Sequence, residues 1–329
     1  MSERFIFLGG HRKCGTTMLL NLFDGHPRCL VYPTDLAVLY AYHPMYIDSD
    51  HSNDERIERL ERVIFRNLEK IRSKHVLNDQ LPVDRMREHF FDALGQERLQ
   101  DVAAIVKQMI ASYRFATGQS VDEKPVVIVK ETSVEIHARV LAESFPDARF
   151  IPLVRDPRDN LGALRAGVEK HYAALGESER QLLASLLHRV GLGYRLDPFN
   201  EAALGAERFQ PLSFERLAAS PEEVMREVAA FIGIGFDADI LSRPTVLGVP
   251  TLGNNYDGER FAAVTARNVG RWRERIGDFE AKVIEFHLGD LMEARGYARA
   301  FPPLEAALAA AEFYNWANTY YYFKDSFAK

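Results

Sequence analysis

The chain has 329 residues, of which 47% are hydrophobic, so it is long enough for one large α/β domain or two smaller ones with a full core. Its net charge of −6 argues against a general nucleic-acid binder, and no apolar run approaches the roughly 18–20 residues of a membrane span. Two cysteines give neither a disulfide framework nor a metal pattern, and a strand that begins within the first few residues leaves no room for a signal peptide, so we expect a soluble, reduced, cytoplasmic protein.

The first predicted elements, within residues 5–17, are a strand, a glycine turn and a helix start. The apolar run from Phe5 is long enough for one buried strand, a Gly-Gly pair interrupts it, and a helix is predicted from Thr16 to about Asp24. Such a turn lets the backbone approach an anion, and the unpaired N–H groups of the helix start point at it. The stretch predicts a phosphate-binding loop; the alternative is an ordinary strand-to-helix turn with surface cations.

This loop departs from the nucleoside-triphosphate loop, which has the pattern G-x-x-x-x-G-K-[ST]. Gly10 and Gly15 have the required spacing, and Thr17 stands at the Ser/Thr position. Thr16, however, occupies the lysine position, and the lysine of this loop is Lys13. A cation at that point would reach a different part of a bound anion.

A second strand is predicted over residues 28–32, and residues 33–35 follow it at the end where ligand groups gather in parallel sheets. Asp35 is therefore a candidate site residue. Residues 55–117 repeat apolar side chains at spacings of three and four, which is typical of helices. We expect them to form an inserted helical cap over about residues 50–120 that contributes to acceptor specificity.

The next strand, over residues 125–129, ends at Lys130. Thr132 with Glu135 fits a capping box, which predicts a helix from there to about Phe145.

A further strand over residues 149–154 ends at Arg155, after which Asp156 is a good N-cap and Pro157 a good first helical residue. An arginine at a strand end beside a helix N-terminus suits an anion. The alternative is a structural ion pair with an acid such as Asp159.

The remaining predicted elements fill the second half of the chain. They are a helix over 179–197, a strand over 209–212, a helix from Ser220 to Gly233, a long loop over 243–270, a helix over 279–295 and an aromatic-rich tail over 302–329. Strands that alternate with helices predict an α/β fold with a parallel β-sheet flanked by helices. The tail could pack on the body of the protein or on a partner subunit of a homo-oligomer.

Five motifs, in order along the chain, resemble those of the sulfotransferases that use 3′-phosphoadenosine 5′-phosphosulfate. They are [RK]-x-G-T-T over residues 13–17, KETS from Lys130 with FPDARF from Phe145, VRDPRD over 154–159, SFERLAASPEEVMREVAAFIGI over 213–234, and NVGRWR over 268–273. The resemblance implies the P-loop-like sulfotransferase core of that family, with one domain over residues 1–300 and a helical tail over 301–329.

The resemblance also implies roles for individual residues. Lys13 would neutralise charge on the leaving phosphate, Lys130 would stabilise the transferring group, and no metal is expected. The donor would be bound by Arg12, Lys13, Cys14, Gly15, Thr16, Thr17, Arg155, Asn160 and Arg271. Ala163 departs from the family pattern, which usually has a serine there for the 3′-phosphate, and Asn160 could take over that contact.

The general base stays open among three residues. Asp35 is our first choice, because it lies near where some family members carry a catalytic glutamate. Glu131 follows a strand end, where Lys130 could pair with it and keep it ionised. His137 falls within a predicted helix. We expect Trp272 to pack against the late loop rather than to stack on adenine.

These observations favour sulfuryl transfer to a hydroxyl or amine of a small-molecule, carbohydrate or lipid acceptor. One alternative is a nucleotide-dependent P-loop kinase, which Thr16 in the lysine position argues against. Another is a donor-binding protein without turnover, which Ala163 suggests. Magnesium dependence would identify the kinase, because phosphoryl transfer from a triphosphate needs the metal.

Overall fold

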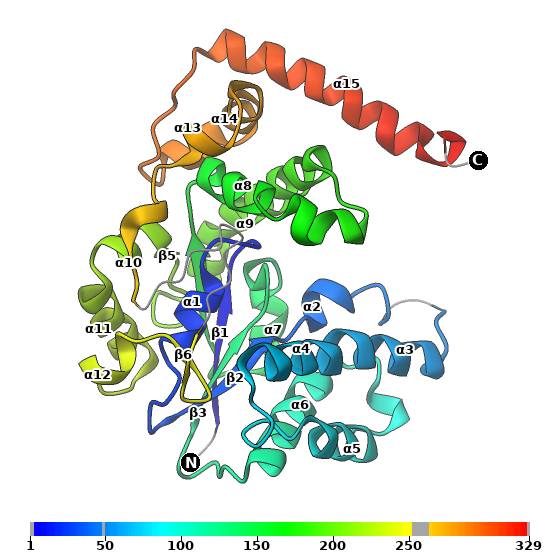
Figure 1. Ribbon diagram of the computed structural model, residues 1–329, viewed down its shortest axis with the longest axis vertical. Helices are drawn as coiled ribbons and strands as arrows, with labels where there is room; N and C mark the ends of the chain where they lie inside the picture. Colours follow the sequence, from blue (N-terminus) through cyan, green and yellow to red (C-terminus); the bar gives the residue numbers. More distant parts are fainter. Residues whose placement is uncertain (1–2, 48–49, 252–262, 328–329) are drawn as a thin grey trace. The chain divides into compact units, whose positions relative to one another are not determined.

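The computed structural model describes residues 3–47, 50–251 and 263–327 (Figure 1). Contacts along the chain group the described residues into two compact units. The first unit holds the residues up to 154 together with 197–251 and 263–266, and the second holds 155–196 and 267–327. The domain boundary expected at residue 300 stays a prediction.

A parallel sheet lies in the first unit. Its strands are β1 (Arg4–Gly9), β2 (Cys29–Asp35), β3 (Val126–Lys130), β4 (Arg149–Val154) and β5 (Leu212–Ser213), in the order β2-β3-β1-β4-β5. Each pairing in this sheet is parallel, which confirms the predicted fold class. Because the winding reverses at β1, the loop after β1 lies at the switch point where ligands bind in open α/β sheets.

β2 and β5 differ from their predicted ranges by more than one residue. β2 continues through Asp35, because pairing resumes after a bulge with Asp35 opposite Lys130. Residues 33–35 are therefore part of the strand, although Asp35 is still at its carboxyl end. β5 is confined to Leu212–Ser213, and the earlier residue Phe209 forms an isolated bridge.

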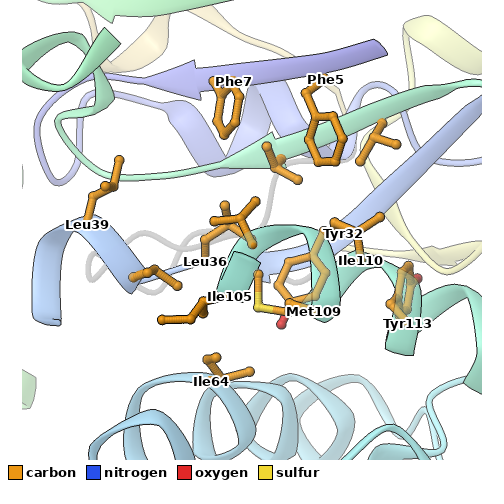
Figure 2. Close-up of a cluster of buried hydrophobic side chains, with 14 of the residues drawn as sticks. Phe5, Phe7, Tyr32, Leu36, Leu39, Ile64, Ile105, Met109, Ile110 and Tyr113 are labelled. Atoms are coloured by element: carbon orange, nitrogen blue, oxygen red, sulfur yellow. The ribbon is translucent and has the colours of Figure 1, made fainter. Parts of the chain in front are cut away.

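One hydrophobic cluster joins the sheet to the helices of residues 53–117 (Figure 2). These helices are α3 (Asn53–Leu60), α4 (Arg66–His75), α5 (Val83–Leu94) and α6 (Val102–Thr117), with a π-helical segment over Glu61–Phe65. Phe5 and Phe7 of β1 share the cluster with Ile64 and Met109, and all four are buried. Because alternate residues of a strand face opposite sides, the helices cover one face of the sheet. The helical pattern predicted for this region is confirmed, with non-helical breaks between the helices.

Shorter helices complete the first unit. They are α1 (Thr16–Asn21), α2 (Val38–Ala41), α7 (Ala138–Ser144), α10 (Phe214–Ala219), α11 (Pro221–Ile232) and α12 (Ala238–Leu241). The loop predicted over residues 243–270 contains the antiparallel pair β6 (Thr245–Val246) and β7 (Val249–Pro250). Residues 252–262 of that loop lie outside the described residues.

The capping box predicted at Thr132 is wrong. The Thr132 hydroxyl donates to Asp35, and the Glu135 carboxylate accepts from the backbone N–H of Gly10. With both side chains engaged elsewhere, the chain first makes a 3₁₀ turn over Val134–Ile136, and α7 begins after it.

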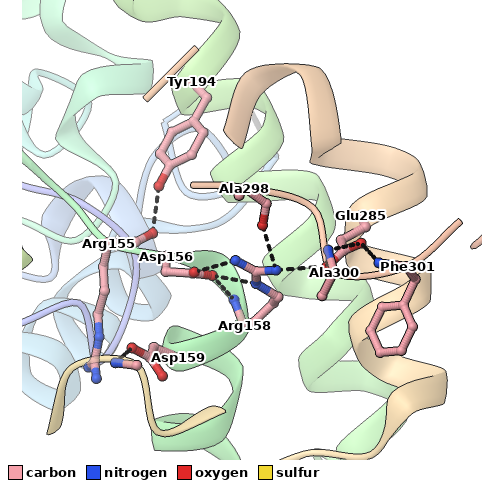
Figure 3. A network of polar contacts seen from close by, with 10 residues as sticks. Arg155, Asp156, Arg158, Asp159, Tyr194, Glu285, Ala298, Ala300 and Phe301 are labelled. Carbon is pink, nitrogen blue, oxygen red and sulfur yellow. Dashed lines mark hydrogen bonds and ion pairs between the residues drawn. The ribbon is translucent and has the colours of Figure 1, made fainter. Parts of the chain in front are cut away.

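The second unit is helical and is held by a buried ionic network (Figure 3). It contains α8 (Pro157–Arg165), most of α9 (Glu179–Leu204), α13 (Trp272–Arg275), α14 (Asp278–Glu293) and α15 (Pro303–Phe327). The Arg158 guanidinium lies 2.7 Å from carboxylate oxygens of both Asp156 and Glu285. Glu285 also accepts from the N–H groups of Ala300 and Phe301, so it links α8 to the segment that leads into α15. Among residues 3–47, 50–251 and 263–327, no helix combines the length and apolar character needed to cross a bilayer.

Candidate active site

The turn after β1 has a backbone that glycines make possible. Gly10 and Gly15 adopt φ angles of +114° and +106°, and Lys13 between them has a φ of +65°. A Cβ atom on Gly10 would lie 2.4 Å from the carbonyl oxygen of Leu153, so a larger residue does not fit without displacing β4. Lys13 is thus carried in a left-handed turn at the sheet's switch point.

The turn leads into α1, whose N-cap position is Gly15. Glycine has no side chain with which to cap the helix, and the N–H groups at such a helix start, together with the helix dipole, favour an anion. Cys14 and Thr16 are buried, whereas Arg12, Lys13 and Thr17 are half-buried. The geometry fits the phosphate-binding loop that the sequence predicts.

A charged cluster lies where β2 and β3 end. Asp35 Oδ2 is 2.6 Å from Lys130 Nζ and accepts a hydrogen bond from the Thr132 hydroxyl at 2.9 Å. Asp35 Oδ1 accepts a longer hydrogen bond, at 3.3 Å, from the N–H of Ala37. The Asp35 side chain is 22% exposed and that of Lys130 is 10% exposed, so the pair is mostly shielded but still open to solvent.

Glu131 behaves differently from its sequence prediction. Lys130 pairs with Asp35 rather than with Glu131, which is fully buried. The carboxylate of Glu131 accepts from the N–H groups of Val38 at 2.9 Å and Tyr40 at 3.1 Å. Burial, and secondarily the nearby Asp35 charge, raise the pKa of Glu131 well above its usual value, although the backbone N–H groups oppose that rise.

The three candidate bases therefore differ in access. The Asp35 side chain is partly exposed, and that of Glu131 is fully buried. His137 is half-buried in the turn before α7, and the centroid of its ring lies 5.3 Å from the ring centroid of His43. Because a base must reach the acceptor, the geometry favours Asp35 over Glu131.

The residues predicted to bind the 3′-phosphate lie in the second unit. Arg155 directly follows β4 in the chain, its guanidinium donates to the Asn268 carbonyl at 3.0 Å, and its own carbonyl accepts from the Tyr194 hydroxyl at 2.6 Å (Figure 3). Asn160 is buried in α8, and Ala163, one turn later, is half-buried.

The late motif is tied to the start of α8. The N–H of Gly270 donates to Asp159 Oδ2 at 2.6 Å. Arg271 pairs with Glu274 at 2.9 Å. Trp272 is 4% exposed, and the guanidinium carbon of Arg158 in α8 lies 4.6 Å from the centroid of its ring. Trp272 therefore packs on α8, and the predicted packing against the late loop stays a prediction.

The sequence matches the family model described as "Sulfotransferase family" over residues 5–238, which is more than half of the chain. The chain belongs to the sulfotransferase family. Members of this family are transferases, so the predicted enzyme class is confirmed. Among curated proteins, none matches the chain.

Solved structures show the same fold. The sulfotransferase domain of the olefin synthase from Synechococcus PCC 7002 is 18% identical, with a TM-score of 0.55, and the match covers 92% of this chain and 96% of that one. The sulfotransferase domain of the curacin biosynthetic pathway is 14% identical, with a TM-score of 0.59, and the match covers 91% and 99%.

Several of the predicted site residues stand at or directly after strand ends, and each unit holds its own set. In the first unit, the carboxyl edge of the sheet carries the loop predicted to bind the donor (residues 10–17, here the donor loop), Asp35 and Lys130. In the second unit, Arg155 precedes α8, Asn160 lies within it, and Arg271 belongs to the late motif.

Sequence reasoning missed the hydrogen bonds that position the loops of this sulfotransferase. Glu131 binds a segment 93 residues earlier in the chain, and Glu135 binds the donor loop across 125 residues. No local spacing signals such partners. One indication of such contacts was present in the sequence, which is that the charged residues Lys130, Glu131 and Glu135 occur at or soon after the end of the buried strand β3.

Proposed function

We propose that this sulfotransferase moves a sulfuryl group from 3′-phosphoadenosine 5′-phosphosulfate to a hydroxyl or amine acceptor by in-line transfer. The observation that carries the proposal is the left-handed turn bearing Lys13, which shares a sheet edge with the Asp35–Lys130 pair. One edge thus offers a cation for a phosphate and a carboxylate for a proton.

In the proposed reaction the acceptor oxygen or nitrogen attacks sulfur as the bond from sulfur to the phosphate oxygen breaks. The leaving phosphate keeps the bonding electron pair, and Lys13 neutralises the charge that develops there. Asp35 takes the acceptor's proton, and Lys130 both holds Asp35 and stabilises the transferring group. The preformed loop supplies positioning, which is a large part of any such transfer.

The donor's two phosphates have separate partners in the proposal. Arg12, Cys14, Gly15, Thr16 and Thr17 bind the 5′-phosphate through N–H, hydroxyl and guanidinium groups. The 3′-phosphate is assigned to Arg155, Asn160 and Arg271. The guanidinium of Arg155 is preorganised by its bond to Asn268, and that of Arg271 by its pairing with Glu274.

We expect a small-molecule, carbohydrate or lipid acceptor, a cytoplasmic location and no metal requirement. The net charge of −6 disfavours a polyanionic partner such as nucleic acid. A homo-oligomer formed through the C-terminal tail is also part of the proposal.

The test uses donor labelled at sulfur, incubated with fractionated cell extract in the presence of EDTA. Labelled product should form, and Lys13→Ala should lower its formation about 10²–10³-fold while binding of 3′-phosphoadenosine 5′-phosphate falls much less. Magnesium-dependent phosphoryl transfer from ATP would instead identify a kinase. Tight nucleotide binding without product from any fraction would identify a donor-binding protein.

A further inference from the structure

Two glutamates on the segment between β3 and α7 have buried carboxylates. Glu131 is 0% exposed and Glu135 is 5% exposed. Burying a carboxyl group is costly unless it is hydrogen-bonded. Both groups accept backbone N–H bonds, Glu131 from the start of α2 and Glu135 from the donor loop, and neither takes part in the reaction proposed above.

Glu131 holds the start of α2, the short helix that follows β2. Its Oε2 accepts from the N–H of Val38 at 2.9 Å, and its Oε1 accepts from the N–H of Tyr40 at 3.1 Å. These bonds hold the first turn of α2, which begins three residues after Asp35. The position of the proposed base thus depends on a segment that Glu131 anchors.

Glu135 holds the donor loop. Its Oε2 accepts from the N–H of Gly10 at 2.9 Å, and the carbonyl of Gly10 in turn accepts from the N–H of Ser133 at 2.9 Å. Asn200 of α9 donates to the backbone carbonyl of Glu135 at 2.8 Å, which anchors the segment itself. The first residue of the loop is therefore held on both its N–H and its carbonyl.

We propose that Glu131 and Glu135 are positioning residues with separate tasks: Glu135 sets the donor loop, and Glu131 sets the start of α2, which follows Asp35 on the acceptor side. Ser133 lies between them with a φ of +60°, so the chain bends sharply between the two carboxylates. One short segment thereby aligns the two sides of the reaction. The assignment of a donor side and an acceptor side rests on the proposed function.

The test compares Glu131→Gln, Glu135→Gln and the exposed control Glu143→Gln by amide hydrogen exchange and by calorimetric titration with 3′-phosphoadenosine 5′-phosphate. The Glu131 carboxyl group accepts two N–H bonds, of which a glutamine oxygen can keep one. At Glu135 the amide replaces a charged acceptor by a neutral one, which weakens the bond from the N–H of Gly10. Glu135→Gln should speed exchange in a peptide over residues 8–15 about tenfold and weaken nucleotide binding about fivefold or more. Glu131→Gln should speed exchange over residues 36–42 similarly and leave nucleotide binding within a factor of two.

The proposal is overturned if either variant loosens both peptides equally, or if the two variants weaken nucleotide binding to the same extent. Should a glutamine variant fail to fold, Glu131→Asp and Glu135→Asp shorten each carboxylate by one methylene and should give the same selective pattern. A wild-type protein that does not bind the nucleotide would refute the proposed donor, while the exchange pattern would still decide whether the two anchors are separate.

Discussion

Replacing Asp35 with asparagine should remove the proposed base and leave the strand end almost unchanged in shape. Asp35 Oδ2 is occupied by Lys130 at 2.6 Å and by Thr132 at 2.9 Å. Oδ1 has the longer bond to Ala37, at 3.3 Å, so it is the oxygen with capacity for a proton from the acceptor. Asparagine keeps an accepting oxygen for its neighbours but cannot take that proton.

Two magnitudes follow from this geometry. Lys130 loses a charged partner in a pair whose side chains are 10% and 22% exposed, so the free energy of unfolding should fall by about 1–3 kcal/mol, less than for a fully buried pair. Loss of a positioned base should lower turnover about 10²-fold or more, which corresponds to roughly 2.7 kcal/mol in the activation barrier.

Single-turnover transfer of labelled sulfate to an acceptor found in the extract screen gives the rate. Chemical denaturation gives the stability, and calorimetry gives the affinity for 3′-phosphoadenosine 5′-phosphate, which should stay within a factor of a few. His137→Ala, made in parallel, tests the rival base. If Asp35→Asn turns over as fast as the wild-type protein while His137→Ala is inactive, our placement of the base is wrong.

Three further predictions concern the 3′-phosphate and the buried acid. Arg155→Ala should weaken the binding of 3′-phosphoadenosine 5′-phosphate by about 1.5–3 kcal/mol, and that of adenosine 5′-phosphate far less. Equal losses of binding free energy for the two nucleotides in titration calorimetry would contradict the role of Arg155. Ala163→Ser should tighten the binding of the 3′-phosphorylated nucleotide by about 0.5–1.5 kcal/mol, because it adds a hydroxyl donor. Unchanged affinity in the same titration would mean that another group already binds at this position. Because folding raises the pKa of Glu131, its contribution to stability is present below the ordinary value of 4.5 and is lost as the pH rises through the folded pKa. In Glu131→Gln the unfolding free energy should therefore decline less steeply with pH above about pH 4.5. The measurement is a series of urea titrations at different pH values, and an unchanged pH dependence would show that Glu131 does not titrate as described.

The ends of β1, β3 and β4 could be located from the sequence because parallel sheets follow simple rules. An apolar run that ends in a charged or glycine-rich turn marks a strand end, and the carboxyl ends of parallel strands share one edge. The donor loop with Lys13, and the strand ends at Lys130 and Arg155, could therefore be named from spacing and composition. The helix start at Asp156 could also be predicted, because an aspartate N-cap followed by proline depends only on neighbouring residues in the sequence.

Partner choice among polar groups was decided only by the tertiary structure. Lys130 is adjacent to Glu131 in the chain, but successive residues of an extended strand point to opposite sides, and the bulge in β2 brings Asp35 opposite Lys130 instead. Likewise the spacing of Thr132 and Glu135 suggested a capping box. In the structure, the Glu135 carboxylate instead accepts a bond from the buried N–H of Gly10, which lies 125 residues earlier in the chain. Local sequence determined which groups would stand at the edge of the sheet. Strand register and burial decided which of them bond to each other, because both arise from contacts between residues about 90 or more positions apart.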